Sequence, residues 1–289
     1  MTRIVADTTC GLAPEFTQRL GIPLIPQIIH FGEESFREGV DIDHATFMAR
    51  LRNGKELPKT AAPYPGDFLE VFESLARAGE SIVCVHPSSE VSGTVRSAMT
   101  AKESFPEADI RVIDTRTIAG PLASMVLAAG RLAREGGTAD QVEELVHEMM
   151  PRARIYFLVD TLEFLQRGGR IGGASALVGT ILQIKPILTL RNGRVDQFEK
   201  ERTKRRALAR VKEVALAEAA RGDDSRLTVM HTGVPTEATE LAEELKVALG
   251  AGDAMVMELV PAIVTHAGPG ALAVGFFTPP AGSEGGLAA

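Results

Sequence analysis

The feature that most constrains the fold is a regular alternation of short apolar runs with segments of helical periodicity. Ser81–Val85 is the clearest run, because it is rich in β-branched residues and is typical of a buried strand. A polar turn follows it, and then a helix expected over Val95–Phe105. Further strands are expected at Arg3–Ala6, Ile22–Ile29 and Ile110–Ile113, and further helices at Asp43–Arg52, from Asp67, at Leu122–Glu135 and from Thr138 to Met150. This alternation predicts an α/β domain with a parallel sheet.

The second half of the chain has a different pattern. Asn192-Gly193 lies between two apolar runs and is the strongest short signal for a β-hairpin. A hairpin with helices packed on it predicts an α+β domain with a largely antiparallel sheet. We therefore expect two domains, an N-terminal α/β domain over residues 1–160 and a C-terminal α+β domain over residues 161–280. The Gly- and Ala-rich tail over residues 281–289 is expected to be disordered.

Composition excludes several classes of function. The formal net charge is −7 and the pI is near 5.5, which argues against nucleic acid as the main partner, since phosphate binding needs a basic surface. The two cysteines, Cys10 and Cys84, have no spacing typical of a metal site or a disulfide framework. The chain enters its first expected strand without a signal peptide, and no apolar run is long enough to span a bilayer. We expect a cytoplasmic protein without a metal.

The polar loop after Ser81–Val85 is a candidate anion site. It carries Ser88, Ser89, Ser92, Gly93 and Thr94. Free backbone N–H groups and the positive end of the helix dipole would meet there, and the hydroxyl groups add uncharged donors. The anion could be a carboxylate or a phosphate. The alternative is that these hydroxyl groups only cap the helix.

Three further loops stand out, each with a simpler structural alternative. The loop 59–67 has two prolines before a helix, so we expect Thr60 on a stiffened loop, or only a connecting turn. The loop 167–173 combines four glycines with two arginines that could pair with an anion, or it ends a helix as a hinge. The loop 265–270 places His266 in a tight turn between two strands, where it could bind a ligand or make a structural hydrogen bond.

Together these loops resemble those of the DegV family, the fatty-acid-binding proteins of the FakB type. The motifs occur in the family's order and extend from about Arg3 to Phe277. They are Asp7-Thr8-Thr9, Gly39-Val40-Asp41-Ile42, Lys59-Thr60 with Pro63 and Pro65-Gly66-Asp67-Phe68, Ser88 to Thr94, Asp160-Thr161-Leu162 with Leu165, Arg167 to Ile171, Ile184 to Leu188, and His266 to Gly270.

The resemblance implies two domains that hold a long-chain fatty acid between them. Thr60 and Ser92 would bind its carboxylate, together with Gly93, Thr94 and His266 as members of the same site. Gly93 would give the ligand close access to the backbone, and His266 would complete or orient the hydrogen bonds. The ligand would be the only bound group, with no cofactor.

The resemblance also implies a protein partner. The family presents its fatty acid to a separate kinase, which converts the carboxylate to an acyl phosphate, so the chain itself would not be an enzyme. Arg170 and Arg202 are then expected at the mouth of the pocket or in the contact with the kinase, and transient contact with a membrane is allowed. Two departures from the family pattern affect the head-group region, Ala61-Ala62 where Ser-Gln is usual and His86-Pro87 where a more apolar step is usual.

Two other functions fit the same residues. The chain could be a lipid or ester hydrolase with Ser92 as nucleophile and His266 as base, although Ser92-Gly93-Thr94 is not a Gly-x-Ser-x-Gly elbow. It could also bind a phosphate-bearing ligand, such as a sugar phosphate, at the start of the helix.

Overall fold

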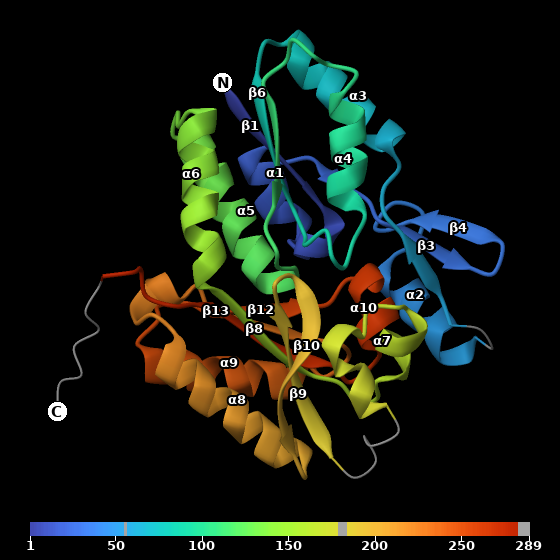
Figure 1. Cartoon of the computed structure of the whole chain (residues 1–289), viewed down its shortest axis with the longest axis vertical. Coiled ribbons are helices and arrows are strands. Elements are labelled where there is room, and N and C mark those ends of the chain that lie inside the picture. Colours follow the sequence, from blue (N-terminus) through green and yellow to red (C-terminus); the bar gives the residue numbers. More distant parts are fainter. Residues whose placement is uncertain (55–56, 179–183, 283–289) are drawn as a thin grey trace.

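The computed structural model describes residues 1–54, 57–178 and 184–282 of the chain, and it contains the expected parallel sheet (Figure 1). Four strands lie in the order β2-β1-β6-β7, and every neighbouring pair is parallel. They are β1 (Thr2–Asp7), β2 (Leu24–Ile25), β6 (Ser81–His86) and β7 (Ile110–Asp114). The connections from β1 and β6 run in opposite directions, so the carboxyl ends of these two strands meet at the switch point of the sheet.

Helices cover both faces of this first sheet. One face packs against α3 (Pro65–Arg77) and α4 (Thr94–Lys102), and the other packs against α5 (Ala119–Arg134) and α6 (Ala139–Met149) (Figure 1). The short helix α1 (Pro14–Leu20) packs on α5. The expected helix from Thr138 begins with a capping box, since the side chains of Thr138 and Gln141 each accept from the other's backbone N–H.

The second sheet has six strands and is largely antiparallel, as predicted. Its order is β10-β9-β8-β13-β11-β12, and only β11 and β12 run parallel. The strands are β8 (Ala153–Leu158), β9 (Lys185–Arg191), β10 (Arg194–Glu201), β11 (Thr228–His231), β12 (Met255–Glu258) and β13 (Leu272–Phe277). Asn192 and Gly193 form the predicted turn, with φ values of 50° and 80°, the left-handed conformation that a two-residue hairpin favours.

The outer face of the second sheet packs against α8 (Lys204–Glu218) and α9 (Pro235–Leu249). Its inner face meets α5, which therefore lies between the two sheets (Figure 1). The layers follow one another as helix, sheet, helix, sheet and helix. The largest cluster of buried side chains spans the central layers and includes Val83, Leu122, Met230 and Leu259.

A third sheet was not expected from the sequence. It has the order β4-β3-β5 and consists of β3 (Ile28–Phe31), β4 (Glu34–Arg37) and β5 (Lys59–Ala61), with α2 (His44–Asn53) beside it. The expected strand Ile22–Ile29 is therefore two strands in different sheets. Thr60 lies on β5 opposite Ile29, so its expected position on a loop is wrong.

The expected boundary at residue 160 falls after β8, although β8 already belongs to the second sheet. The division into two domains stays a prediction. Residues 283–289 of the expected disordered tail lie outside the described residues. Among the described helices, none has the length and apolar character that a bilayer crossing requires.

We predict that Gly120→Ala destabilises the packing of α5 on the second sheet. A Cβ at Gly120 would lie 2.2 Å from Thr228 Oγ1 and 2.9 Å from Met230 Sδ, so the helix or the strand must shift. The free energy of unfolding should fall by about 1–3 kcal/mol in urea titrations followed by circular dichroism. The matched control is Gly66→Ala, since Gly66 is exposed on α3 with no atom within 4 Å of its Cβ position. Equal stability of the two variants would contradict the prediction.

Candidate functional site

A cavity lies where α5, the second sheet and the loops of the first sheet meet, and its space is about 920 Å³ when the adjoining open solvent is included. Most of its wall is apolar. The second sheet contributes Ile155, Phe157, Leu190, Val195, Met230 and Ala273. Ile118, Ala119, Leu165, Leu259 and Ile263 come from the elements around it.

Polar side chains line one part of this wall. They are Thr9, Gln27, Thr60, Ser92, Arg170 and His266. The structure thus brings together four residues that the sequence analysis singled out, Thr60, Ser92, Arg170 and His266, from four different segments. Thr9 and Gln27 were not predicted as site residues. Thr9 falls within the family motif at the start of the chain, whereas Gln27 has no local signal.

His266 and Thr60 are joined by a hydrogen bond of 2.8 Å between Nε2 and Oγ1. His266 lies in the last turn of α10 (Pro261–Ala267), so its expected position in a turn between two strands is wrong. The turn begins one residue after the helix, at Gly268.

The imidazole of His266 is neutral at physiological pH. Burial, assisted by the nearby guanidinium of Arg170, lowers the pKa of His266 to about 4. A neutral ring carries one N–H, and its Nδ1 is buried without a hydrogen-bond partner among the described residues. We therefore place the proton on Nε2, where it is donated to Thr60 Oγ1. The hydroxyl proton of Thr60 is then free to point into the cavity.

Gly168 leaves room for this ring. A Cβ at Gly168 would lie 2.1 Å from His266 Nδ1. Part of the expected glycine-rich loop therefore serves the close packing of α7 (Glu163–Arg167) against α10.

Ser92 reaches the cavity from the loop between β6 and α4. Its Oγ lies 2.8 Å from Thr94 Oγ1, and Thr94 is fully buried behind it. Thr94 does not line the cavity, and it reaches the cavity wall only through its hydrogen bond with Ser92, so a direct contact between Thr94 and a ligand is not supported. Gly93 is the residue before α4 and faces Ala62, since a Cβ there would lie 3.2 Å from the Ala62 side chain.

Arg170 lines the cavity. Its side chain donates to the backbone carbonyls of Val91, at 3.1 Å, and Gly168, at 2.7 Å. It also lines an open groove next to the cavity, together with Lys59 and Arg167. Arg202 is exposed before α8 and does not line the cavity, so only its expected role in a partner contact remains, as a prediction.

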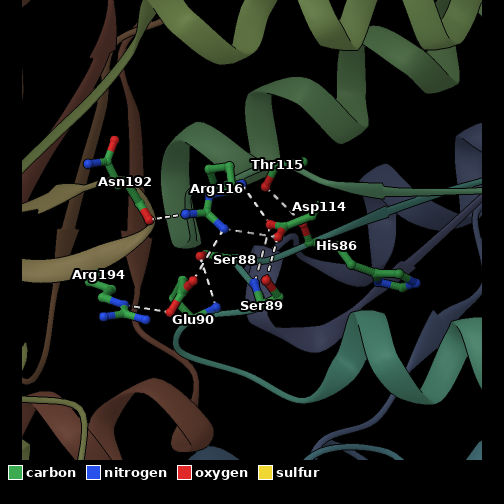
Figure 2. A network of polar contacts seen from close by, with 9 residues as sticks. All are labelled: His86, Ser88, Ser89, Glu90, Asp114, Thr115, Arg116, Asn192 and Arg194. Carbon is green, nitrogen blue, oxygen red and sulfur yellow. Dashed lines mark hydrogen bonds and ion pairs between the residues drawn. The ribbon is translucent and has the colours of Figure 1, made fainter.

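The loop that carries Ser92 is anchored on its outer side (Figure 2). Ser89 donates to the carboxylate of Asp114 from its backbone N–H, at 3.2 Å, and from its hydroxyl, at 2.5 Å. Glu90 accepts from Arg194 at 2.5 Å and lies 3.6 Å from the guanidinium of Arg116. Arg116 also donates to the backbone carbonyl of Asn192 at the tip of the β9–β10 hairpin. Exposed ion pairs stabilise weakly, so the main effect of this network is to fix the loop against the hairpin.

The arrangement does not resemble a catalytic triad. The side chain of Ser92 is bonded to Thr94 and that of His266 to Thr60, so the nucleophile and base of the hydrolase hypothesis are not paired. Over residues 1–54, 57–178 and 184–282, no group of three or more His, Cys, Asp or Glu side chains is placed to hold a metal ion.

We predict that His266 makes the stability of the protein depend on pH. Its pKa is about 4 when folded and about 6.5 when unfolded, so the unfolded chain binds more protons between these values. The contribution is fully present above pH 6.5 and is lost as the pH falls toward 4, by at most about 3 kcal/mol. In urea titrations at several pH values, His266→Gln should remove this contribution, so the slope of the free energy of unfolding against pH between about 4 and 6.5 should be less positive than in the parent. Burial raises the pKa of Glu38 to about 7, which has the opposite sign, so the variant must be compared with the parent. Identical slopes would contradict the prediction.

The sequence is similar to known proteins over nearly its whole length. The sequence model described as an uncharacterised protein of the DegV family matches residues 1–279. A DegV domain-containing protein of Streptomyces coelicolor is 37% identical over 273 residues, which cover 94% of this chain and 96% of the relative.

Two solved structures superimpose over nearly the whole chain. A DegV family protein from Thermus thermophilus, described with fatty acid binding, has a TM-score of 0.88 and 30% identity, and the match covers 96% of this chain and 99% of that one. DegV from Bacillus subtilis, described as a fatty acid binding protein, has a TM-score of 0.86 and 29% identity with the same coverage. The match in sequence and in fold extends through both sheets and all the loops that form the cavity, and this chain therefore belongs to the DegV family.

Proposed function

We propose that this chain binds a long-chain fatty acid, with the alkyl tail in the cavity and the carboxylate at Thr60 and Ser92. The observation that carries the proposal is an apolar cavity whose polar wall presents hydroxyl groups already bonded to His266 and Thr94. The relatives from Thermus thermophilus and Bacillus subtilis, both described as binding fatty acids, support it.

The tail would supply most of the affinity. Burial of a methylene group contributes about 0.8 kcal/mol, so roughly fifteen of them contribute at most about 12 kcal/mol. Association and ordering oppose binding by several kcal/mol. A dissociation constant between micromolar and nanomolar, about 8–12 kcal/mol, is consistent with this balance.

The head group would be bound by uncharged donors. An unpaired carboxylate in an apolar cavity is costly, and hydrogen bonds from Thr60 and Ser92 offset that cost. Among the described residues, Arg170 is the cationic side chain that lines the cavity, but it already donates to the carbonyls of Val91 and Gly168. The carboxylate is then held without a salt bridge, which leaves an oxygen more nucleophilic than in an ion pair.

We further propose that a separate fatty acid kinase phosphorylates this oxygen to give an acyl phosphate. The support is the position of Thr60, Arg170 and His266, which line both the cavity and the open groove next to it. A phosphoryl group could approach the carboxylate from the groove, where Lys59 and Arg167 would attract it. The Arg202 side chain, exposed outside the cavity, is the proposed contact for the kinase.

The other two functions are less well supported. A hydrolase would need Ser92 to contact His266, and a phosphate-binding protein would not need an apolar cavity next to its anion site. Hydrolysis of a chromogenic ester that depends on Ser92 would favour the first, and competition of a sugar phosphate with a fatty acid would favour the second.

We predict that freshly purified protein carries a fatty acid that native mass spectrometry detects.

We also predict that Ser92→Ala and Thr60→Val each weaken the binding of palmitic acid. Loss of one hydrogen bond to a charged group corresponds to roughly a tenfold or larger rise in Kd. Delipidated protein would be titrated with palmitic acid by isothermal calorimetry. Ser104→Ala is the control, because Ser104 is exposed and does not line the cavity. Absence of any bound lipid would contradict the proposal, and unchanged affinity in both variants would contradict the assignment of the head-group site.

The kinase partner is tested separately. With a purified bacterial fatty acid kinase and ATP, we expect the palmitate-loaded protein to yield acyl phosphate, trapped as the hydroxamate. Arg202→Glu should lower the rate of transfer at least several-fold without a change in the Kd for palmitate, because Arg202 lies outside the cavity. Glu107→Lys, at an exposed residue of the first half, is the charge-reversal control. Transfer that is equal in both variants would contradict the placement of the kinase at Arg202.

A further inference from the structure

We propose that Asp7, Gln27 and Thr94 are positioning residues that fix the direction in which the Ser92 hydroxyl donates, so that the cavity selects a carboxylate over an uncharged polar head group. The inference rests on the proposed function, because it explains how the same site recognises the acid.

Asp7 ends β1, is fully buried, and acts as the acceptor at the start of a chain of hydrogen bonds. Its Oδ1 accepts from the backbone N–H of Thr9 at 3.0 Å, from the Thr9 hydroxyl at 2.6 Å and from Gln27 Nε2 at 3.0 Å. Its Oδ2 lies 2.8 Å from His86 Nδ1. Both carboxylate oxygens therefore receive donors.

The carboxylate of Asp7 sets the orientation of the Gln27 amide. A flipped amide would place Oε1 against a carboxylate oxygen, so the nitrogen must face Asp7. The second N–H of this nitrogen then points to Thr94 Oγ1, at 2.9 Å. Gln27 is only 3% exposed, so no bulk water competes for these protons.

Because Thr94 accepts a hydrogen bond from Gln27, it donates its own hydroxyl proton to Ser92. Its hydroxyl accepts from Gln27 and has one proton of its own, and its other side-chain contact is Ser92 Oγ at 2.8 Å. The backbone N–H of Thr94 also donates to Ser92 Oγ, at 3.3 Å. Ser92 Oγ thus accepts two hydrogen bonds, while its own proton has no acceptor among the described residues. Since Ser92 lines the cavity, that proton is available to a ligand.

Helix capping alone does not account for these contacts, because the first turn of α4 needs neither Asp7 nor Gln27. His86 belongs to the same inner network, and it is one of the two departures from the family pattern noted in the sequence. Figure 2 shows its imidazole turned away from Asp114 and Ser89, which hold the outer side of the loop. Its Nδ1 instead fixes Asp7. The contacts of Asp7 with Gln27 and His86 therefore set the hydrogen-bond direction, whereas the contacts of Ser89 with Asp114 fix the position of the loop.

The consequence is selectivity for the head group. A carboxylate only accepts hydrogen bonds, and Ser92 and Thr60 both present protons. An alcohol must also donate, and a wall whose hydroxyl groups already donate toward the cavity offers it a poorer match. The ratio of the Kd for hexadecan-1-ol to the Kd for palmitic acid measures this preference at constant chain length.

The test is Gln27→Glu, measured with both ligands on the delipidated full chain. The carboxyl oxygen that replaces Gln27 Nε2 must share a proton with Asp7 Oδ1, and it accepts the proton of Thr94. Thr94 then accepts from Ser92, and Ser92 presents lone pairs to the ligand. We expect the alcohol-to-acid ratio to fall roughly tenfold or more. Thr94→Val removes the hydroxyl group between Gln27 and Ser92 without adding a carboxyl group, and it should lower the ratio less. Thr94→Ser keeps a hydroxyl group at this position and should show the ratio of the parent. Ser225→Ala, which removes a buried hydroxyl group that donates to the carbonyl of Gly222 outside the cavity lining, should leave it unchanged.

The outcomes are distinct. A lower ratio in Gln27→Glu with recovery in Thr94→Ser supports the inference. If Gln27→Glu weakens both ligands in proportion, or leaves the ratio as in the parent, the network is only structural and the inference is wrong. If Gln27→Glu does not fold, an unchanged ratio in Thr94→Val overturns the inference and a lowered ratio with recovery in Thr94→Ser supports it. If the parent protein binds palmitic acid in none of these experiments, the proposed function itself fails.

Discussion

The hydrogen bond between Thr60 and His266 is the interaction on which the cavity depends. It joins an edge strand of the small third sheet to a helix 206 residues later in the chain. The bond closes the polar side of the cavity, and it fixes which atom of each group faces inward. Because burial lowers the pKa of His266 to about 4, the bond is between neutral groups and holds over the physiological pH range. A charged imidazole would place a second cation beside Arg170 and turn a neutral site into a basic one.

The two sheets make different contributions to the site. The carboxyl ends of β1 and β6 meet at the switch point of the parallel sheet, and the loops that follow them carry Thr9 and Ser92. The inner face of the second sheet supplies apolar side chains such as Phe157 and Met230. Neither sheet alone could bind an amphipathic ligand, since one lacks an apolar wall and the other lacks donors. The position of α5 between them sets the spacing that leaves room for the cavity.

Most of the fold could be predicted from local patterns, and the exceptions have physical causes. Apolar runs and helix periodicity identified β1, β6 and β7 of the parallel sheet and the helices that cover it, and Asn192-Gly193 identified the hairpin of the second sheet. The third sheet was missed because β5 is only three residues long and reads Lys-Thr-Ala, without an apolar pattern. The helix α10 was missed because it has seven residues and depends on tertiary contacts, among them the N–H of Ala262 bonded to buried Glu38 at 2.6 Å. The candidate site was found through motifs, which marked Thr60, Ser92 and His266 but not Gln27, a residue whose role depends on groups far away in the sequence.

In the proposed function, two hydroxyl protons, those of Ser92 and Thr60, bind the carboxylate. The buried polar side chains behind them would set the direction in which these two hydroxyl groups donate. A hydroxyl group in an apolar cavity can donate or accept, and by itself it distinguishes poorly between head groups. Asp7 is a fixed acceptor, and through Gln27 and Thr94 it makes the Ser92 hydroxyl accept on its inner side and donate toward the cavity. Neutral His266 is a fixed donor, and it does the same for the Thr60 hydroxyl directly. The two hydroxyl groups then act together as a pair of donors. Under the proposed function, this arrangement would recognise the charge of a carboxylate without a countercharge, which is the condition under which the bound oxygen would keep its reactivity.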